Sequence, residues 1–364
     1  MKNYDVYLPS YSIGDDVYRK IPSICLPFGK KAVVIGGKQA MAASLDEILK
    51  YAKEQIEILD IRWYGGEASY ENVAVLEALE SVRNADMIFA VGGGKALDTC
   101  KTLGENLNKP VFAFPTIAST CAATTAVSIM YHPDGSFLKP HFLKAPPKHA
   151  FIHTGILAKA PSRYLWAGMG DTYAKYFESA MSSRGEALTH YHALGVTTSH
   201  MCLSPILSHG KAALDANREG NVTDAFEEVV LAIIVTTGIA SILLTKEKKI
   251  DYNTGLAHAI FYSLTSDKNI EENHLHGEVV GFGVLVLLLV DGDVDMFRTM
   301  FDFHQSVGLP TCLGDIEYDA SRIEEVAKAA AVMHDIDHNP YPITAEMIQC
   351  ALEKLENYHN RKEF

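Results

Sequence analysis

Short apolar runs alternate with amphipathic segments in the first part of the chain. The apolar runs are rich in β-branched and aromatic residues, which predicts strands at 31–37, 56–66, 86–91 and 110–116. Helical spacing of apolar positions appears between them, at 38–55, 70–83 and from about Lys95 onward, and Ser69 is expected to cap the second of these helices. Strands alternating with helices predict a parallel, Rossmann-like sheet in an α/β domain spanning residues 1–157.

The pattern changes after this sheet. The letters YHPDGSF, at 131–137, predict a hairpin turn between two short strands. From Pro161 onward the strand signals fade, and helical patterns such as 162–181 and 344–362 take over. Residues 158–364 are therefore expected to form an all-α domain, and no internal repeat is visible in the chain.

Composition agrees with two folded domains. The chain has 364 residues, of which 48% are apolar and 21% charged, as in a soluble globular protein. Its net charge of −13 would repel phosphate backbones and anionic lipids, which argues against a nucleic-acid or membrane-surface partner.

Cysteine usage and apolar runs bear on the cellular compartment. The six cysteines are scattered without a CxxC pair, so we expect no disulfide framework and no thiolate zinc site, and a cytoplasmic location. Residues 1–16 lack the apolar core of a signal peptide. The most apolar run, 229–244, is shorter than the ~20 residues of a membrane span and is expected to be a buried helix.

A glycine loop, GGGKALDTCK at 92–101, follows the third predicted strand. It matches neither a Walker A loop nor GxGxxG. It does bring glycine N–H groups and a helix N-terminus together, a geometry that suits a pyrophosphate. Lys95 opposes the helix dipole, which a bound anion would explain, and Asp98 could hold the loop by accepting from backbone N–H groups. The alternative is a tight strand–helix turn with a solvated lysine.

A second loop, PTIASTCAATT at 115–125, follows the fourth predicted strand. Its small hydroxylated side chains could bond a phosphate or a ribose without adding bulk. An ordinary Ser/Thr loop is the alternative.

Candidate metal ligands lie in the helical half. Asp171 follows glycines at an expected helix start, where it could instead be a cap. His258 lies in an apolar helix and could be a hydrogen-bonded core residue. His274 and His276 are two residues apart, so at most one of them would face a shared site. An Asp-His-His set would suit Zn²⁺ or Fe²⁺ with an open position and would support Lewis-acid chemistry.

These motifs together resemble the glycerol dehydrogenase branch of the iron-containing (group III) alcohol dehydrogenases, which share a two-domain architecture with dehydroquinate synthase. The likeness covers nearly the whole chain. It rests on five ordered motifs: GGGKALDTCK, PTIASTCAATTAVSIMY, GMGDTYAKYFE, GLAHA and HLHGEVVGFG.

The resemblance implies specific roles for residues of this sequence. Asp171, His258 and His276 would hold the catalytic divalent metal, Zn or Fe, and through it would be the catalytic residues. The residues implied at the NAD or NADP cofactor are Gly37, Gly93, Gly94, Lys95, Asp98, Thr116, Ser119, Thr125, Val127 and Tyr131.

Cys121 departs from the glycerol dehydrogenase pattern, which has an aspartate there that contacts the polyol. A thiol cannot accept hydroxyl hydrogen bonds as a carboxylate does, and it would repel a substrate carboxylate less. The AxTCAA form is more similar to a hydroxycarboxylate dehydrogenase subgroup, so Cys121 is the expected substrate residue.

Two further departures concern the cofactor and the pocket wall. Gly37 and Lys38 stand where the family often has an acidic residue that bonds the adenosine ribose, which leaves NADP as acceptable as NAD. Phe261 and Tyr262 replace a second histidine and an asparagine near the reacting carbon.

The resemblance therefore implies a metal-dependent, NAD(P)-linked dehydrogenase acting on a small alcohol, polyol or 2-hydroxy acid, with the 2-oxo acid/2-hydroxy acid pair favoured over glycerol. Glycerol dehydrogenase activity proper is the enzymatic alternative. A non-catalytic nucleotide-binding protein that retains the fold is the alternative of another class. The partner is expected to be a small-molecule substrate, and the family implies a homo-oligomer.

Overall fold

The computed structural model describes residues 5–245 and 252–361. The parts of the predictions that reach residues 1–4 and Lys362 lie outside these ranges. The chain divides into two compact units, the first comprising Met1–Ser162 with Ala216–Val230 and the second Arg163–Asp215 with Leu231–Phe364. The domain boundary expected between residues 157 and 158 falls inside helix α6 (Thr154–Ala158). The later segment that groups with the first unit is not expected from the sequence.

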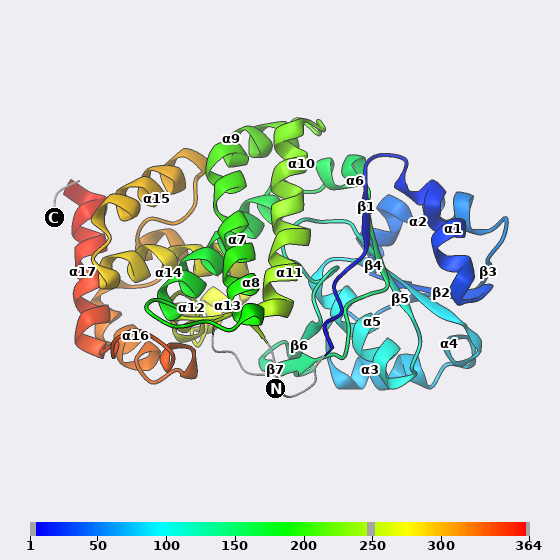
Figure 1. The fold of residues 1–364 in the computed structure, drawn as a ribbon, viewed down its shortest axis with the longest axis horizontal. Helices are drawn as coiled ribbons and strands as arrows, with labels where there is room; N and C mark the ends of the chain where they lie inside the picture. Colours follow the sequence, from blue (N-terminus) through cyan, green and yellow to red (C-terminus); the bar gives the residue numbers. More distant parts are fainter. Residues whose placement is uncertain (1–4, 246–251, 362–364) are drawn as a thin grey trace. The chain divides into compact units, whose positions relative to one another are not determined.

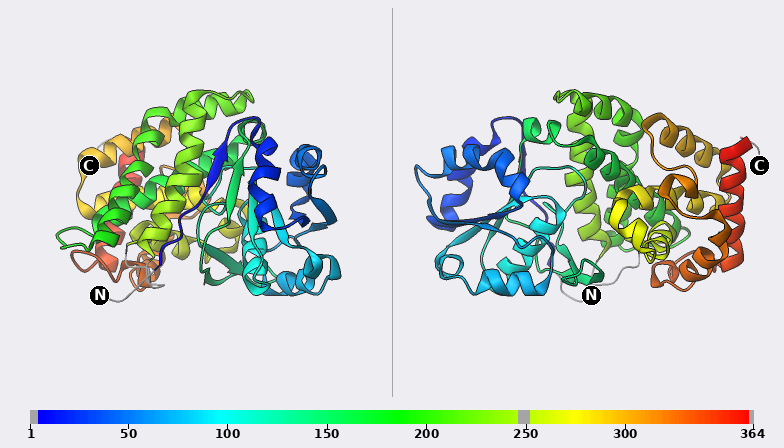
Figure 2. Two further views of the ribbon diagram at one scale, coloured as in Figure 1. Left: turned by 45° about the vertical axis from the view of Figure 1, so that its right-hand side comes forward. Right: turned by 180° about the vertical axis from the view of Figure 1, so that it is seen from behind.

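The first unit contains all the strands of the described residues (Figures 1 and 2). Its strands are β1 (Tyr11–Ile13), β2 (Lys31–Gly36), β3 (Glu57–Trp63), β4 (Met87–Gly92), β5 (Val111–Pro115), β6 (Val127–Tyr131), β7 (Phe137–Phe142) and β8 (His149–Ile152). Its helices are η1 (Val17–Lys20), α1 (Ile21–Cys25), η2 (Leu26–Phe28), α2 (Lys38–Ala52), α3 (Tyr70–Glu77), α4 (Glu80–Asn84), α5 (Gly94–Asn106), α6 and most of α10 (Asp224–Leu231).

Six strands form one parallel sheet in the order β1-β8-β5-β4-β2-β3. The four predicted strands are confirmed as β2, β3, β4 and β5. Strands β1 and β8, which the sequence pattern does not predict, pair with each other and extend the sheet beyond β5. Aliphatic and aromatic side chains of β2, β4, β5 and β8 pack with η1, α1 and α2 into one buried core, which holds Tyr18, Ile48, Phe89 and Phe114 among others.

The predicted hairpin and helix cap are confirmed. Strands β6 and β7 pair antiparallel on either side of the YHPDGSF turn. The Ser69 hydroxyl accepts the Asn72 N–H at 3.2 Å and so caps α3. The single helix predicted at 70–83 is wrong, because Leu79 takes an extended conformation, with φ −72° and ψ 132°, which separates α3 from α4.

The regular elements of the second unit are all helical in its described residues, as predicted. Its elements are α7 (Ser162–Ser182), α8 (His190–Ser199), η3 (His200–Cys202), α9 (Ser204–Arg218), η4 (Ala232–Thr236), α11 (Thr237–Leu244), α12 (Leu256–Leu264), α13 (Lys268–Asn273), α14 (His276–Asp291), α15 (Val294–Val307), η6 (Leu313–Ile316), η7 (Ala320–Arg322), α16 (Ile323–Ala330), η8 (His334–Ile336) and α17 (Ala345–Arg361). The division into units cuts through α9 and α10, and Ser162, the first residue of α7, groups with the first unit.

Helix α14 is the centre of this unit. Every residue from Gly277 to Leu289 is buried, and the helix packs against α12, α15 and α17. A helix that is apolar on all sides is stable only when neighbours surround it.

One helical segment among the described residues, Asp224–Leu244, is long and apolar enough to cross a membrane. The prediction that the apolar run is too short for a span is therefore not supported, because the helix extends to 21 residues. The expectation of a buried helix is confirmed, since 67% of the most apolar stretch of this segment is buried inside the protein.

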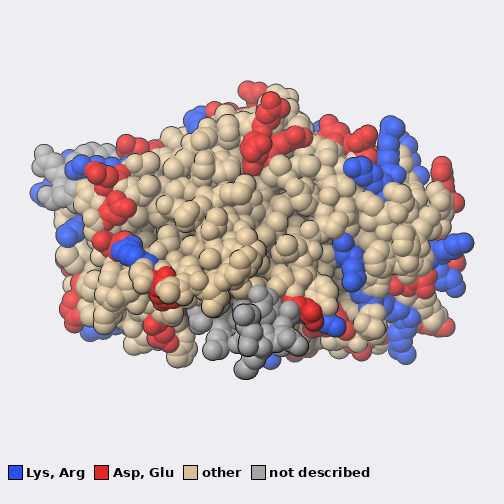
Figure 3. All heavy atoms as spheres, viewed as in Figure 1, with Lys and Arg blue, Asp and Glu red and all other residues tan. Residues whose placement is uncertain are grey.

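Charged side chains are unevenly spread over the face drawn in Figure 3. Lys and Arg gather over the part of the first unit where α1, α2 and β3 lie. The net negative charge of the chain therefore does not describe every part of its surface.

Candidate functional site

Glycines let three helices of the second unit approach until their backbones touch. A Cβ built on Gly170 of α7 would collide with the Gly277 carbonyl of α14, and one on Gly277 would collide with the Ala167 carbonyl of α7. A Cβ on Gly283 of α14 would likewise collide with the Ala257 carbonyl of α12. Side chains that leave these helices next to the crossings are therefore brought close together.

One cluster of candidate metal ligands, Asp171, His258 and His276, comes from these three helices. The ligand atoms of the cluster all lie within 4.8 Å of one another. Oδ1 of Asp171 lies 3.7 Å from Nε2 of His258 and 3.5 Å from Nε2 of His276. The expectation that Asp171 starts a helix is wrong, because it lies in the middle of α7 and caps nothing.

Glu178 fixes the orientation of His258. Its Oε2 lies 2.7 Å from Nδ1 of His258, and its Oε1 accepts the backbone N–H groups of Gly255 and His258 at 2.8 and 2.9 Å. Because an ionised carboxylate can only accept hydrogen bonds, the imidazole proton lies on Nδ1. The lone pair on Nε2 is therefore directed toward the cluster.

The cluster balances buried charges of opposite sign. Burial alone would raise the pKa of Asp171, but His276, Lys175 and His258 together hold it well below its usual value. Burial would also raise the pKa of Glu178, and His258 and Lys175 lower it on balance. Both carboxylates are therefore anionic at neutral pH, and Lys175, whose Nζ donates to the Asn253 carbonyl at 2.7 Å, provides a nearby positive charge.

The two histidines of HLH have different environments. His274 ends α13, and its Nδ1 lies 2.8 Å from Oε1 of Glu278. His276 begins α14, and its side chain is 39% exposed. Phe261 packs edge-on against His276, with ring centres 4.4 Å apart. Only His276 of this pair joins the cluster, as expected, although a turn between helices separates the two residues.

This donor set fits a divalent metal. One carboxylate and two imidazoles, one of them locked in the tautomer that frees Nε2, leave at least one coordination position to another ligand. These are ligands that Zn²⁺ and Fe²⁺ both accept.

The glycine loop of the first unit lies where the strand order reverses. The chain runs from β2 outward to β3 and then returns to β4 on the other side of β2. Gly37 follows β2, and Gly93 and Gly94 follow β4, so they lie past the carboxyl ends of neighbouring strands, where such sheets bind ligands. Gly92 has a φ of +149°, and a Cβ on Gly93 would come within 2.5 Å of Ile117.

Lys95 has a protein partner that the sequence analysis missed. Its Nζ lies 2.6 Å from Oε2 of Glu67 and 4.8 Å from the centre of the Tyr131 ring. The Glu67 carboxylate supplies the anion that we expected a ligand to supply. The placement of Lys95 at a helix start is therefore explained without a ligand, and the bare glycine backbone is the stronger argument for a bound phosphate.

Asp98 does not hold the glycine loop, contrary to expectation. Its Oδ2 accepts the backbone N–H of Ile129 at 3.0 Å, and its Oδ1 pairs with Lys101 at 2.8 Å. Burial raises the pKa of Asp98, and Lys101 and the Ile129 N–H oppose this. Lys101 also donates to the Val127 carbonyl at 2.5 Å. Asp98 and Lys101 therefore fasten α5 to β6.

The second loop lies against the first. A Cβ on Gly94 would lie 3.4 Å from Oγ1 of Thr120, and the Thr116 N–H donates to the Gly92 carbonyl at 3.3 Å. The Cys121 carbonyl accepts the N–H groups of Thr124 and Thr125, which folds this loop into a turn. Thr116 and Thr125 are buried, and Ser119, Cys121 and Val127 are partly exposed.

Known proteins are similar to this chain in both sequence and fold. A family profile described as "Iron-containing alcohol dehydrogenase" matches residues 9–153. The chain is 35% identical over 307 residues to a glycerol dehydrogenase of Thermotoga maritima, covering 81% of each protein. It is 30% identical over 338 residues to hydroxycarboxylate dehydrogenase A of Escherichia coli, covering 90% of each.

The chain belongs to the iron-containing alcohol dehydrogenase family. It lies in the glycerol dehydrogenase-like branch of that family and is an oxidoreductase acting on alcohols. The crystal structure of glycerol dehydrogenase from Schizosaccharomyces pombe has the same fold, with a TM-score of 0.86 and 24% identity over 99% of this chain and 92% of that one.

Two charged residues of this alcohol dehydrogenase site, Lys175 and Glu178, are not among the residues expected from the sequence. A signal for both was present, since they follow Asp171 by four and seven residues. Positions with that spacing share one face of a helix. Charged residues on the apolar face of a core helix need a partner or a ligand.

Proposed function

We propose that this protein is a metal-dependent, NAD(P)-linked dehydrogenase that interconverts a small 2-hydroxy acid and its 2-oxo acid. The observation that carries the enzymatic part of the proposal is the convergence of Asp171, His258 and His276 within 4.8 Å. When bound there, a divalent cation would supply Lewis-acid polarisation of the substrate oxygen, and the nicotinamide cofactor would carry the hydride.

The residues of the chain then have distinct tasks. Glu178 holds the proton of His258 at Nδ1, so that Nε2 is available to a ligand. The partly exposed face of His276 gives access to the site, and the Phe261 ring fixes the plane of that imidazole. In the first unit, Gly93 and Gly94 present backbone N–H groups at the start of α5 to the cofactor pyrophosphate.

Cys121 supports a 2-oxo acid, rather than glycerol, as the class of substrate. It stands where the glycerol dehydrogenases have an aspartate, and a thiol offers no carboxylate to accept the hydroxyl groups of a polyol. A thiol also adds no negative charge to repel the carboxylate of a substrate. The similarity to hydroxycarboxylate dehydrogenase A points in the same direction.

Glycerol dehydrogenase activity is the second candidate, because the relative from Thermotoga maritima carries that name at 35% identity. Initial rates of NADH and NADPH oxidation distinguish the two substrate assignments. The rates are measured in the presence of Zn²⁺ or Fe²⁺, with either a panel of 2-oxo acids or dihydroxyacetone. We expect the highest kcat/KM with a 2-oxo acid. A higher kcat/KM with dihydroxyacetone would overturn the substrate assignment and leave the dehydrogenase assignment intact.

Two variants and one control variant sharpen this experiment. Cys121→Asp should shift the kcat/KM ratio toward dihydroxyacetone by about tenfold, the effect of one good hydrogen bond to a charged group. Cys350→Ser, at an exposed cysteine of α17, is the matched control. His276→Ala should abolish turnover while cofactor binding persists, and full activity in that variant would refute the metal-site assignment.

A further inference from the structure

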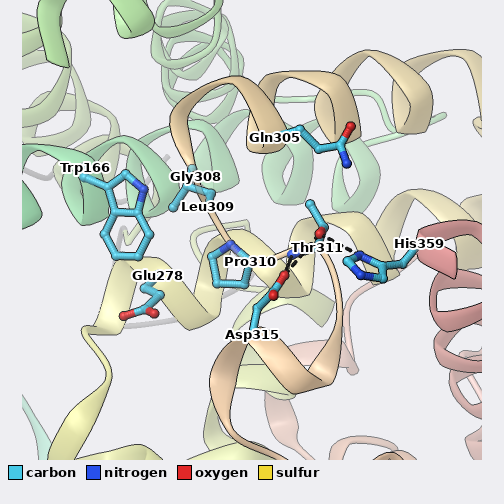
Figure 4. Close-up of a pocket in the computed structure, with 9 residues that line it drawn as sticks. All are labelled: Trp166, Glu278, Gln305, Gly308, Leu309, Pro310, Thr311, Asp315 and His359. Carbon is cyan, nitrogen blue, oxygen red and sulfur yellow. Dashed lines mark hydrogen bonds between the residues drawn. The ribbon is translucent and has the colours of Figure 1, made fainter. Parts of the chain in front are cut away.

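The second unit contains a pocket that the proposed function does not use. It has a volume of about 430 Å³ and is lined by Trp166, Glu278, Gln305, Gly308, Leu309, Pro310, Thr311, Asp315 and His359 (Figure 4). Glu278 follows His276 by two residues, so the two side chains leave α14 in different directions. Figure 4 shows Trp166, Glu278 and Pro310 on one side of the pocket and Thr311, Asp315 and His359 grouped on the other.

A second set of residues that could hold a metal ion lies on the side of the pocket where Thr311, Asp315 and His359 are grouped. Cys312, Asp315 and His359 each offer a donor atom, and the three atoms lie within 4.8 Å of one another. Cys312 directly precedes η6 and is 8% exposed, Asp315 lies within η6 three residues later, and His359 comes from the last turns of α17. The set thus joins a short loop to a helix that is distant in sequence.

Hydrogen bonds hold the carboxylate and the imidazole together. Oδ2 of Asp315 accepts the backbone N–H of Thr311 at 2.8 Å and lies 3.1 Å from the Thr311 hydroxyl. The same hydroxyl lies 2.9 Å from Nδ1 of His359. Figure 4 shows this chain of contacts. A single threonine therefore positions two of the three donors.

The loop that carries these residues is also fixed at both ends. Nδ1 of buried His304 lies 2.7 Å from the Pro310 carbonyl, and its Nε2 lies 2.6 Å from the Tyr173 hydroxyl. The Leu313 N–H donates to Oε1 of Glu356 at 2.7 Å, one turn before His359 on α17. A site built on fixed elements loses little conformational entropy when a ligand binds.

The chemistry of Cys312 argues against a role as a nucleophile. Burial raises the pKa of the thiol to about 11; the Asp315 and Glu356 carboxylates act in the same direction, and a hydrogen bond from the backbone of Asp315 opposes them. A cysteine in that environment is protonated at neutral pH and unreactive toward electrophiles. A metal cation beside the sulfur is the partner that would draw the proton away.

We propose that Cys312, Asp315 and His359 form a second divalent metal site, selective for Zn²⁺, whose fourth position opens toward the pocket lined by Thr311, Asp315 and His359. A thiolate with an imidazole favours zinc over Mg²⁺ or Ca²⁺, and three protein ligands leave one position for water or a small solute. On binding, the S–H bond of Cys312 breaks, its proton passes to solvent, and a sulfur lone pair forms the bond to zinc. No oxidation or reduction takes place, and the proposal does not depend on the substrate of the enzyme.

Cobalt substitution tests this proposal on the full chain. Of the two sites, only the second offers a thiolate, so a thiolate-to-Co²⁺ charge-transfer band in the near ultraviolet reports on it alone. We expect the band in the wild type and in His276→Ala. We expect its loss in Cys312→Ser and its retention in Cys350→Ser and Cys121→Ser. A band that persists in Cys312→Ser, or that is absent from the wild type, would overturn the proposal.

Zinc content after gel filtration gives a second readout. We expect two zinc ions per chain in the zinc-loaded wild type and one in each of Cys312→Ser and His276→Ala. Zinc that remains in His276→Ala but is absent from the double variant Cys312→Ser/His276→Ala is bound at the second site and not at the first. Should Cys312→Ser fail to fold, Asp315→Asn and His359→Gln replace it, since both positions reach the surface. One zinc ion per wild-type chain, retained in these variants and lost in His276→Ala, would contradict a second site.

Discussion

Nδ1 of His258 lies 2.7 Å from Oε2 of Glu178, and both side chains are almost fully buried, with exposed fractions of 4% and 0%. The carboxylate accepts a hydrogen bond from the Nδ1–H group, which leaves the Nε2 lone pair facing Oδ1 of Asp171 at 3.7 Å. Glu178 touches neither Asp171 nor His276 in any contact of the described residues, so it acts on the cluster by orienting His258.

Replacing Glu178 with glutamine should weaken metal binding. The amide could donate to Nδ1 and thereby move the ring proton to Nε2, the atom that a metal needs. Removing such a partner of a ligating histidine costs about 10–100-fold in metal affinity. Competition with a chelator measures this directly on the apoprotein.

A matched control and a second variant make the test specific. Glu272→Gln removes an exposed carboxylate of α13 and should leave zinc affinity unchanged. His258→Ala should lose at least as much affinity as Glu178→Gln. Equal affinity of Glu178→Gln and wild type would show that the hydrogen bond does not determine the histidine tautomer.

Substituting Gly277 with alanine should separate the ligand-bearing helices. The added Cβ would meet the Ala167 carbonyl of α7, and backbone cannot yield as a flexible side chain does. Overpacking of this kind costs about 1–3 kcal/mol or more in the free energy of unfolding. We also expect a loss of zinc affinity, because α7 carries Asp171 and α14 carries His276.

Urea unfolding and zinc titration measure the two effects of Gly277→Ala. Gly37→Ala is the control, because its Cβ would meet nothing closer than 3.7 Å. That variant should unfold as the wild type does and keep its zinc affinity. Wild-type stability in Gly277→Ala would mean that α7 and α14 can move apart without cost.

The strands and helices of the central sheet could be predicted because each repeats a local pattern. Buried parallel strands such as β4 are continuous apolar runs in the sequence, and Ser69 stands where α3 needs a cap. Strands β1 and β8 could not be found in this way. They are three and four residues long, and only their pairing with each other and with β5 makes them strands.

The candidate site shows the same limit. The sequence motifs point to Asp171, His258 and His276, and the types of these three residues indicate a metal site. Their proximity depends on how closely α7, α12 and α14 cross, which Gly170, Gly277 and Gly283 decide only once the helices are packed. Glu67 could not be assigned to Lys95 from sequence, because 28 residues, which include two helices and strand β4, separate them.

Lys38 should determine the choice between NADPH and NADH. It is the first residue of α2, directly after Gly37, and its Nζ lies 4.5 Å from the centre of the Trp63 ring. No acidic side chain stands at position 37 or 38 to repel a 2′-phosphate. Lys38→Glu should lower the ratio of kcat/KM for NADPH to that for NADH by about tenfold or more.

Steady-state kinetics with both cofactors measure this ratio. Lys50→Ala, in the last turn of the same helix, is the control and should leave it unchanged. The kcat with NADH should stay near the wild-type value in Lys38→Glu, since the residue would act on cofactor binding alone. An unchanged ratio would exclude Lys38 from cofactor selection.

The pH dependence of stability should reflect His304, which is fully buried between Tyr173 and Pro310. Burial lowers its pKa from 6.5 to about 4, because the charged imidazole is poorly solvated there. The unfolded chain therefore takes up a proton near pH 6.5, and the folded chain does so only near pH 4. The contribution of His304 to the free energy of unfolding is therefore fully present above pH 6.5. It falls as the pH drops from 6.5 to 4, by about 3 kcal/mol in all.

Unfolding by urea at several pH values between 4 and 7 measures this slope, and His304→Gln should reduce it. Glutamine cannot be protonated, so the variant is expected to be less stable at pH 7, where the histidine hydrogen bonds are lost, and to lose less on acidification. His149, in the first unit, has a pKa lowered to about 4 by burial and by Lys20, so His149→Gln is an informative comparison. If the slope of His304→Gln equals that of the wild type, His304 takes up its proton at the same pH in the folded and unfolded chains, and the buried neutral imidazole is ruled out.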